Sequence, residues 1–224
     1  MFELYLDTAD LEKVKRFNAC LPLKGITTNP SILAKQGVGV NQLLTSMSEV
    51  LGEAARFHVQ VVSATVSGIL EEAIQLNKLP YDLVVKVPAT EIGLAAIKKI
   101  KQQDIPVLAT AIYSAEQGFM AALSGADYLA PYVNRIDTLG VNGINAVADL
   151  QWLLEQHQLN SKILAASFKS SYQAMEVMKL GIGAITLPVD VAEQMITNTT
   201  VQATVEQFSQ DWQAVFPEQR SFQS

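Results

Sequence analysis

The sequence predicts an α/β protein whose fold is a single-domain (β/α)8 barrel, the TIM barrel, over residues 1–224. Eight short apolar runs alternate with segments of helical periodicity along the chain. The spacing is about 28 residues per strand–helix unit, which suits a compact barrel. No Gly/Ser-rich linker and no change in composition divides the chain, so one domain is expected.

Most of the expected strands are rich in Val, Ile, Leu and Ala, as is typical of strands that are buried on both faces of a parallel sheet. In chain order they are 3–7 (ELYLD), 24–28 (KGITT), 57–62 (FHVQVV), 83–87 (LVVKV), 106–112 (PVLATAI), 127–133 (DYLAPYV), 162–168 (KILAASF) and 184–188 (AITLP).

The segments between these runs carry helix signals. Residues 93–103 (GLAAIKKIKQQ) and 146–157 (AVADLQWLLEQH) repeat apolar side chains with helical spacing. Several helices are also expected to begin at a capping side chain. These start signals are Asn29 before Pro30, Ser114 with Gln117, and Ser170 with Gln173.

A doubly wound open sheet is the competing architecture, because periodicity alone does not separate it from a barrel. That fold usually brings a glycine-rich phosphate loop. The glycine pairs at 37–40 (GVGV) and 181–186 (GIGAIT) lack the third glycine of the dinucleotide fingerprint, and no Walker pattern is present. The barrel is therefore favoured, and the glycine pairs are expected to form turns.

Charge and cysteine content narrow the class of protein. The chain has 16 Lys and Arg against 22 Asp and Glu, a net charge of -6, and a pI near 4.9. This balance argues against general affinity for nucleic acid or an anionic membrane, but leaves room for one local phosphate pocket. Cys20 is the only cysteine, and the sequence has no secretory signal and no stretch of about 18 apolar residues. A cytoplasmic location is expected.

Polar residues inside the apolar runs are the candidates for chemistry. Alternate side chains of a strand share one face, so Glu3, Tyr5 and Asp7 lie opposite Leu4 and Leu6. By the same rule His58 and Gln60 oppose the valines beside them, and Lys86 opposes Val85 and Val87. Thr110, Tyr132 and Ser167 stand near the ends of later runs. In a barrel this polar set would converge near the C-terminal rim, where enzymes of this fold place their sites.

Lys86 is the most unusual of these residues, because valines and Pro88 surround it in the sequence. It could be a snorkelling lysine or one half of a buried ion pair, with Asp7 as partner. The alternative is a Schiff-base nucleophile. Burial disfavours the ammonium and lowers the pKa of a lysine from about 10.4, which supplies the free amine that attacks a ketone. A carboxylate at Asp7 would oppose that shift, so Asp7 is better suited to carrying a proton.

A metal-dependent reaction has little support in the sequence. The two histidines, His58 and His157, fall on different predicted elements, and no His-x-His or HExxH spacing exists. No metal site is predicted.

Motifs along nearly the whole chain resemble the small-subunit transaldolase-like family, and within it the fructose-6-phosphate aldolases. The segments that carry the resemblance are 4–10 (LYLDTAD), 25–33 (GITTNPSIL), 84–90 (VVKVPAT), 130–137 (APYVNRID), 164–170 (LAASFKS), 184–195 (AITLPVDVAEQM) and 208–212 (FSQDW). The resemblance implies a (β/α)8 barrel, a Schiff base on Lys86, a sugar phosphate substrate, and no metal or organic cofactor.

The resemblance also implies roles for other residues, carried over position by position. They are Asp7 as the acid/base carboxylate, Asn29 as a hydrogen-bonding partner of substrate hydroxyls, Gln60, Thr110 and Tyr132 as the group that holds a catalytic water and moves a proton, and Ser167 and Arg135 as the phosphate ligands. Arg135 fits that role within an acidic protein, because a guanidinium pairs well with phosphate.

Two positions bear on the reaction. Transaldolases of the family resemble one another in carrying Glu at the position of Gln60 and Phe at that of Tyr132, so this chain has the aldolase-like pair. The expected reaction is reversible cleavage of fructose 6-phosphate to dihydroxyacetone and glyceraldehyde 3-phosphate. Transfer of dihydroxyacetone between sugar phosphates is the alternative. A third possibility is a barrel that binds sugar phosphate without turnover, with Lys86 acting only as a charge.

The resemblance finally implies a homo-oligomer, a decamer built from pentamers. In that assembly a C-terminal helix reaches a neighbouring subunit. The helical pattern at 200–216 permits such a helix.

Overall fold

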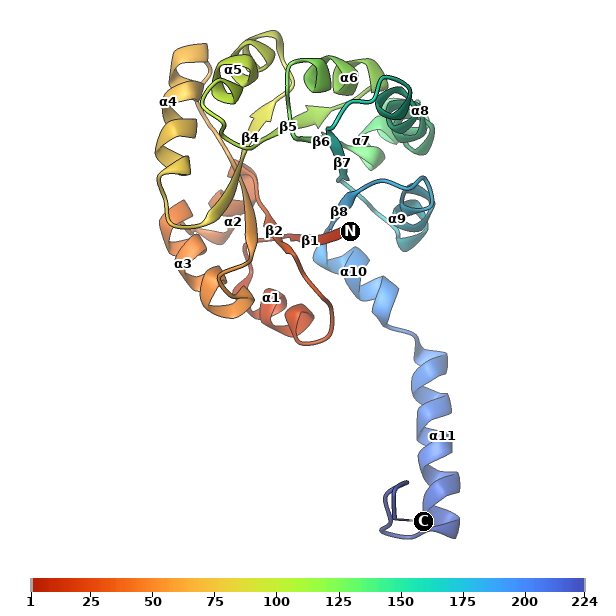
Figure 1. The fold of residues 1–224 in the computed structure, drawn as a ribbon. Helices are drawn as coiled ribbons and strands as arrows, with labels where there is room; N and C mark the ends of the chain where they lie inside the picture. Colours follow the sequence, from red (N-terminus) through yellow and green to blue (C-terminus); the bar gives the residue numbers. More distant parts are fainter. Residues whose placement is uncertain (1, 224) are drawn as a thin grey trace. The chain divides into compact units, whose positions relative to one another are not determined.

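The computed structural model describes residues 2–223 of the chain. The chain divides into two compact units, Met1–Ala192 and Glu193–Ser224. Eight parallel strands of the first unit close into a barrel in sequence order, β1 to β8, with β8 pairing back to β1. Helices cover the outside of this barrel (Figure 1). The predicted (β/α)8 fold is confirmed.

The observed strands coincide with the eight predicted runs, with differences at their ends. They are β1 (Glu3–Asp7), β2 (Gly25–Thr27), β3 (Arg56–Gln60), β4 (Asp82–Pro88), β5 (Val107–Ile112), β6 (Tyr128–Pro131), β7 (Lys162–Ala165) and β8 (Ala184–Leu187). The sixth and seventh runs were expected to extend to residues 133 and 168. They end earlier because Tyr132 begins a helix and Ser167 takes a left-handed φ of 62°.

The described residues form eleven helices, and many begin at a side-chain cap. Their bounds are α1 (Leu11–Asn18), α2 (Pro30–Gln36), α3 (Val40–Leu51), α4 (Val66–Asn77), α5 (Glu91–Lys101), α6 (Ala115–Leu123), α7 (Val133–Thr138), α8 (Gly143–Gln156), α9 (Ser171–Met178), α10 (Val189–Ile196) and α11 (Thr199–Val215). Asn29, Ser114 and Ser170 cap α2, α6 and α9 as expected. Gln117 and Gln173 reach back to the residue before the cap, Tyr113 and Lys169, and so tie the preceding loop to the helix.

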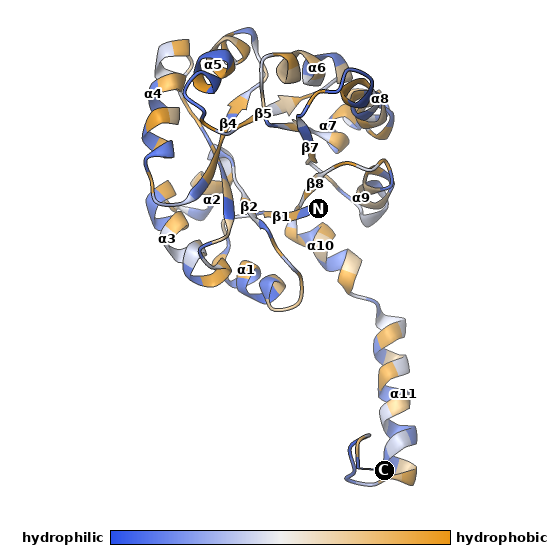
Figure 2. Ribbon diagram, in the orientation of Figure 1, coloured by the Kyte–Doolittle hydropathy of each residue, from blue (hydrophilic) through white to orange (hydrophobic). Residues whose placement is uncertain are grey.

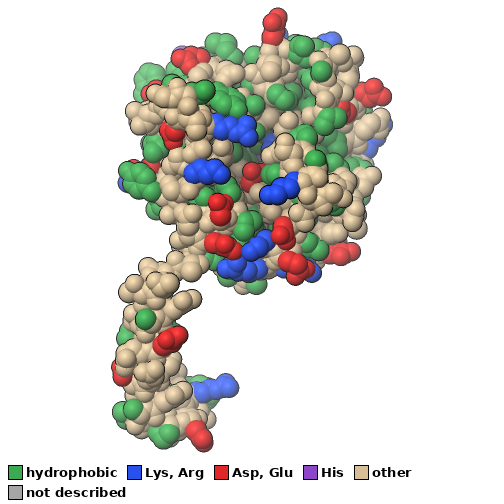
Figure 3. Space-filling view, turned by 180° about the vertical axis from the view of Figure 1, so that it is seen from behind, with side chains coloured by type: hydrophobic (Ala, Val, Ile, Leu, Met, Phe, Trp, Pro, Cys, Tyr) green, Lys and Arg blue, Asp and Glu red, His purple; other side chains and the backbone are tan. Residues whose placement is uncertain are grey.

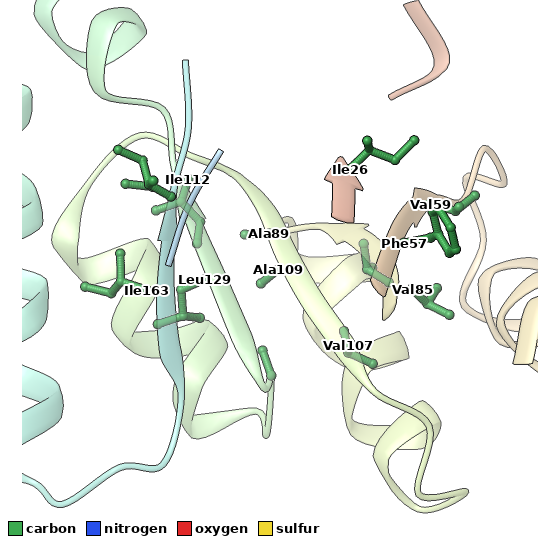
Figure 4. Close-up of a cluster of buried hydrophobic side chains, with 14 of the residues drawn as sticks. Ile26, Phe57, Val59, Val85, Ala89, Val107, Ala109, Ile112, Leu129 and Ile163 are labelled. Atoms are coloured by element: carbon green, nitrogen blue, oxygen red, sulfur yellow. The ribbon is translucent and has the colours of Figure 1, made fainter. Parts of the chain in front are cut away.

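The main core lies between the outer face of the barrel and the helices. Val85, Val107, Leu129 and Ile163 point outward from neighbouring strands into this layer (Figure 4). The helices around the barrel carry hydrophobic and hydrophilic residues in alternation along their ribbons (Figure 2), so a hydrophobic face of such a helix can join this layer. The outward direction of Val85 and Val87 leaves the inward face of β4 to Val84 and Lys86, as the alternation predicts.

The interior of the barrel is packed with its own smaller cluster. Tyr5, Val84, Leu108, Tyr128 and Leu164 fill it and are at most 5% exposed. Toward the N-terminal ends of the strands, the first residues of several strands form a polar network. Glu3 accepts hydrogen bonds from the Tyr5 and Tyr128 hydroxyls and from Lys162. Arg56 donates to the Tyr128 hydroxyl and to Asp82. This network occupies the N-terminal end of the strands, so space for a ligand is left at the other end.

The second unit contains the end of α10 and all of α11, and two aromatic residues of α11 and its C-terminal cap pack together within it. The indole N–H of Trp212 donates to the carbonyl of Gln219 at 2.8 Å, and the rings of Trp212 and Phe216 lie 4.7 Å apart. Within α11 no residue is buried. None of the helices among the described residues has the length and apolar character needed to cross a membrane.

Candidate active site

A cavity of about 180 Å³ lies at the C-terminal ends of the strands, and Lys86 is one of the residues that line it. Lys and Arg side chains gather around a hollow at the middle of the barrel face drawn in Figure 3. The polar residues that line the cavity are Asp7, Thr27, Asn29, Lys86, Tyr132, Arg135, Ser167, Lys169 and Thr186. Six of the eight residues singled out from the sequence are among them. The other two, Gln60 and Thr110, are placed differently.

Lys86 lies on the inward face of β4 and is 5% exposed. Its Nζ donates a hydrogen bond of 2.6 Å to the carbonyl of Thr28, which follows β2. Burial lowers the pKa of Lys86, and the negative charge of Asp7 partly opposes this. Both effects have the directions expected from the sequence. A buried amine with a lowered pKa that faces a cavity is suited to nucleophilic attack.

Asp7, the last residue of β1, is held by a chain of two threonines. The hydroxyl of Thr27 donates to Asp7 Oδ1 at 2.7 Å, and the hydroxyls of Thr27 and Thr186 lie 2.7 Å apart. A hydroxyl has one proton, and that of Thr27 goes to Asp7, so Thr186 must donate to Thr27. These two hydrogen bonds fix one oxygen of the carboxylate and leave Oδ2 to act on a ligand.

Tyr132 brings its phenol to the cavity from the loop that joins β6 to α7. Its Oη lies 2.9 Å from the hydroxyl of Thr110 on β5. Burial raises the pKa of the Tyr132 phenol, the charge of Asp7 raises it further, and the Thr110 hydrogen bond and Arg135 oppose the rise. The phenol is therefore protonated at neutral pH and can donate to a ligand. Thr110 acts through Tyr132 in this geometry rather than from the cavity wall.

Asn29 caps a helix and also lines the cavity. Its Oδ1 accepts a hydrogen bond of 3.0 Å from the backbone N–H of Ile32 and so caps α2. The side chain also lines the cavity. Because the cap uses the oxygen, the amide N–H groups are left to donate to an oxygen of a ligand.

Three side chains of the cavity have the chemistry to receive an anion. Arg135 and Lys169 are cationic, and Ser167, which supplies a hydroxyl, lines the same cavity. The guanidinium of Arg135 packs over the ring of Tyr132, with Cζ 4.8 Å from the ring centroid. A phosphate group fits this chemistry, because Arg and Lys pair with its charge and a hydroxyl can donate to its oxygens.

Gln60 does not line the cavity of Lys86. Its backbone lies beside Lys86 in the sheet, with Gln60 paired to Lys86 in the register of β3 and β4. Paired residues of neighbouring strands point to the same side of a sheet, so the Gln60 side chain starts from the same face as Lys86. Val59 and Gln60 also border a different and larger hollow of about 740 Å³, bounded by the start of α3 and by α4. That hollow includes Glu71 and Glu72 and no cation, so it is a poor site for a phosphorylated ligand.

His58 is buried inside the barrel, beneath the site. It is 1% exposed, and its ring packs edge-to-face against Tyr5 and Tyr128, with centroids 4.8 and 5.2 Å apart. Neither ring nitrogen has a hydrogen-bond partner among the described residues. Burial, and then the charges of Lys86 and Arg56, lower the pKa of His58 well below its usual range, so the imidazole is neutral.

Sequence reasoning missed three polar residues of the cavity: Thr27, Thr186 and Lys169. The first two follow the same rule that identified Asp7, since each is a polar residue near the C-terminal end of an apolar strand. Lys169 lies in the loop after β7, where no strand parity applies. Among the described residues, no three His, Cys, Asp or Glu side chains lie close enough together to hold a metal ion.

The fold and the cavity together define a (β/α)8-barrel protein with a buried lysine and a carboxylate at the C-terminal ends of its strands. A family model described as Transaldolase/Fructose-6-phosphate aldolase matches residues 4–222. The chain belongs to this family, whose members are enzymes of transaldolase or aldolase type.

Solved structures of other proteins share the fold at low sequence identity. A mandelate racemase/muconate lactonizing protein from Paracoccus denitrificans, complexed with magnesium, superposes with a TM-score of 0.57 at 15% identity, over 85% of this chain and 56% of that chain. Thiamine phosphate pyrophosphorylase from Pyrococcus furiosus superposes with a TM-score of 0.56 at 18% identity, over 92% of this chain and 96% of that chain. A mutant flavocytochrome b2 with benzoylformate superposes with a TM-score of 0.62 at 12% identity, over 92% of this chain and 62% of that chain. At these identities the likeness shows the fold alone.

Proposed function

We propose that the protein is a class I aldolase that reversibly cleaves fructose 6-phosphate to dihydroxyacetone and glyceraldehyde 3-phosphate through a Schiff base on Lys86. The observation that carries the proposal is the buried Nζ of Lys86 in a cavity that also presents a carboxylate and a protonated phenol. A buried lysine without chemistry to perform would lower stability without compensation.

The reaction begins at the ketone carbon of the substrate. The neutral Nζ attacks this carbon, and loss of water gives an iminium bound to Lys86. The carboxylate of Asp7 then takes the proton of the C4 hydroxyl, and the C3–C4 bond breaks. Its electron pair moves into the iminium and forms an enamine, while glyceraldehyde 3-phosphate leaves.

The second half returns the enzyme to its starting state. The phenol of Tyr132 lies 2.9 Å from Thr110 and can pass a proton, directly or through a water, to the enamine carbon. Water then hydrolyses the regenerated iminium and releases dihydroxyacetone and free Lys86. The water lost at the start is thereby returned, and the route requires no redox partner. The proton that Asp7 took from the C4 hydroxyl passes through water to the Tyr132 phenolate, which restores both groups.

The phosphate end of the substrate suits the cationic wall of the cavity. We propose that Arg135, Ser167 and Lys169 bind the phosphate and that Asn29 donates to a substrate hydroxyl. Gln60 is proposed from the family resemblance to hold a catalytic water. The register of β3 and β4, which pairs Gln60 with Lys86, supports this role because it places both residues on the same face of the sheet.

Aldolase activity is favoured over transfer by the proton route. A transaldolase must keep the enamine until an acceptor aldehyde arrives, whereas an aldolase must protonate it. A phenol at position 132 supplies the proton that a phenylalanine there would lack. Transaldolase activity remains the second candidate because the family includes it.

Two measurements test the function. Borohydride added with dihydroxyacetone should reduce an imine and leave a permanent mass increase on Lys86; no labelling would leave Lys86 acting only as a charge. Incubation with fructose 6-phosphate alone should then release free dihydroxyacetone. Strict dependence of product formation on erythrose 4-phosphate would instead identify a transaldolase.

Replacing Tyr132 by Phe should separate the two activities. Removal of the phenol proton is expected to slow release of free dihydroxyacetone on the order of 10²-fold while transfer to an acceptor aldehyde is largely kept. Product formation with and without erythrose 4-phosphate measures both rates. The exposed Tyr172 provides a matched control, since Tyr172→Phe should change neither. Equal loss of both activities in Tyr132→Phe would refute the proton route.

We also propose that the protein is a homo-oligomer, and by resemblance a decamer, in which α11 packs on a neighbouring subunit. Apolar side chains recur along α11 at helical spacing, and Val201, Val205, Phe208 and Val215 are all more than half exposed. A stripe of this kind is typical of a helix that is covered by a partner.

Charge placed on this stripe should weaken the assembly. Phe208→Asp is expected to shift the protein to smaller species, because a carboxylate would have to be desolvated in the interface. Analytical ultracentrifugation of both proteins measures the change. Gln202→Asp adds the same charge to another position of α11 and should keep the parent mass. A monomeric parent protein, or an unchanged mass for Phe208→Asp, would contradict the proposal.

A further inference from the structure

Tyr113 is a residue of the site surroundings to which neither the motifs nor the proposed mechanism assigns a role. It directly follows β5 and precedes Ser114, the cap of α6. The Nη1 of Arg135 donates a hydrogen bond of 3.1 Å to its hydroxyl oxygen. This bond is the main reason that the pKa of Arg135 is raised.

Tyr113, Arg135 and Tyr132 form a closed triangle in which each side chain contacts the other two. The guanidinium of Arg135 lies over the Tyr132 ring at 4.8 Å. The rings of Tyr113 and Tyr132 have centroids 5.8 Å apart and planes inclined at 60°. A planar cation held by a hydrogen bond at its edge and by a ring at its face has little freedom to rotate.

The backbone of Tyr113 is itself anchored. Its N–H donates to Gln117 Oε1 at 2.9 Å, and the N–H of Gln117 donates to Ser114 Oγ, so the loop is tied to the first turn of α6. Tyr113 is thus presented from a rigid element. Arg135, by contrast, is exposed and lies on the short helix α7, so without an anchor its long side chain would sample many rotamers.

The hydroxyl of Tyr113 has one oxygen that can accept a hydrogen bond and one proton that it can donate. The oxygen of Tyr113 accepts from Arg135, so its own O–H proton must point elsewhere. The Tyr113 oxygen is therefore engaged by the guanidinium, and the hydroxyl acts on a bound phosphate through Arg135.

We infer that Tyr113 is a positioning residue for the phosphate-binding side of the cavity: it holds the Arg135 guanidinium against Tyr132, in the orientation that receives the phosphate of the substrate. This inference rests on the proposed function of Arg135. It makes Tyr113 a determinant of preference for phosphorylated over unphosphorylated substrates, because only the former use the guanidinium.

The test is Tyr113→Phe, which keeps the ring beside Tyr132 and removes only the hydroxyl. The KM for fructose 6-phosphate is expected to rise about tenfold with kcat nearly unchanged, since one hydrogen bond to a charged group is lost. The inhibition constant of inorganic phosphate should rise by a similar factor. In Tyr113→Phe, the reaction of dihydroxyacetone with an unphosphorylated aldehyde should keep its rate. The control variant Tyr172→Phe should keep the parent rate with every substrate.

A double-mutant cycle distinguishes positioning from a general structural effect. In an Arg135→Gln background, Tyr113→Phe is expected to raise the KM no further, because the hydroxyl acts through the guanidinium. Additive losses, or equal losses with phosphorylated and unphosphorylated substrates, would overturn the inference. Calorimetry of inorganic phosphate binding measures the same effect in the absence of turnover. A failure of the Schiff-base proposal would appear instead as an unlabelled parent protein in the borohydride experiment.

Discussion

Replacing Lys86 by Met is expected to reduce cleavage of fructose 6-phosphate on the order of 10⁴-fold or more, because the covalent route is lost and the other lysine of the cavity, Lys169, is proposed to bind the phosphate. Borohydride with dihydroxyacetone should no longer label the chain. Steady-state rates and intact mass measure the two effects. Lys98 on α5 is exposed and provides the matched control, since Lys98→Met should keep full activity and labelling.

The same substitution is expected to stabilise the fold at neutral pH. The folded-state pKa of Lys86 is lowered, so between that pKa and about 10.5 the unfolded chain binds a proton that the folded chain does not. Stability therefore falls as pH decreases through this window. Met has a similar length and no charge, so Lys86→Met removes this penalty. A gain in thermal stability with loss of activity is the pattern of a functional site.

An inactive variant would be uninformative if it did not fold, so urea denaturation must accompany the rates. Retained activity in folded Lys86→Met would refute the Schiff-base mechanism. Loss of activity with unchanged labelling of the chain would place the imine on another lysine. Cooperative unfolding at higher denaturant concentration than the parent, together with no labelling, is the expected combination.

Replacing His58 by Phe is expected to give the largest change in stability. The imidazole is buried without a partner for either nitrogen among the described residues, and one such unsatisfied group costs about 1–3 kcal/mol. Phe keeps an aromatic ring against the edges of Tyr5 and Tyr128. The free energy of unfolding at neutral pH should rise by about that amount, less any cost of the larger ring.

The pH dependence of stability tests the cause independently of packing. The pKa of His58 is lowered in the folded state, so below about 6.5 the unfolded chain takes up a proton that the folded chain excludes. Stability of the parent should fall as pH decreases from 6.5, by up to about 1.4 kcal/mol per pH unit for this one group, until the folded-state pKa is reached. His58→Phe should lose this part of the slope.

Two further variants control for size and for histidine content. His58→Leu is closer in volume to the imidazole and should also lose the slope. His157 is exposed at the end of α8, and His157→Gln should keep the parent slope. An unchanged slope in both His58 variants would show that the imidazole is not excluded from protonation in the folded state.

Alternation and composition were sufficient for much of the architecture and part of the site. Valines flank Lys86 on β4, and side chains of a strand alternate, so the inward direction of Lys86 follows from the sequence. Asp7 and Tyr132 stand at the ends of apolar strands, and parallel strands bring such ends together at one rim. The buried lysine and its lowered pKa were therefore predictable from local pattern.

Alternation failed where the backbone departs from a regular strand. Thr110 and Ile112 should share a face, yet Thr110 meets Tyr132 while Ile112 packs in the outer core. Ala111 between them has a φ of 56°, and the pairing of β5 with β6 shifts there, which marks a bulge. The extra residue reverses the parity of the strand, and no signal in the sequence marks it.

By itself, then, the order of amino acids determined the barrel, the inward lysine and the carboxylate at the same rim, because these depend on the period of a strand and on closure of a parallel sheet. Only the tertiary structure decided which hydroxyls reach Asp7, that Thr110 reaches the site through Tyr132, and that Tyr113 holds Arg135. These depend on distances between segments far apart in the chain, which local patterns do not contain.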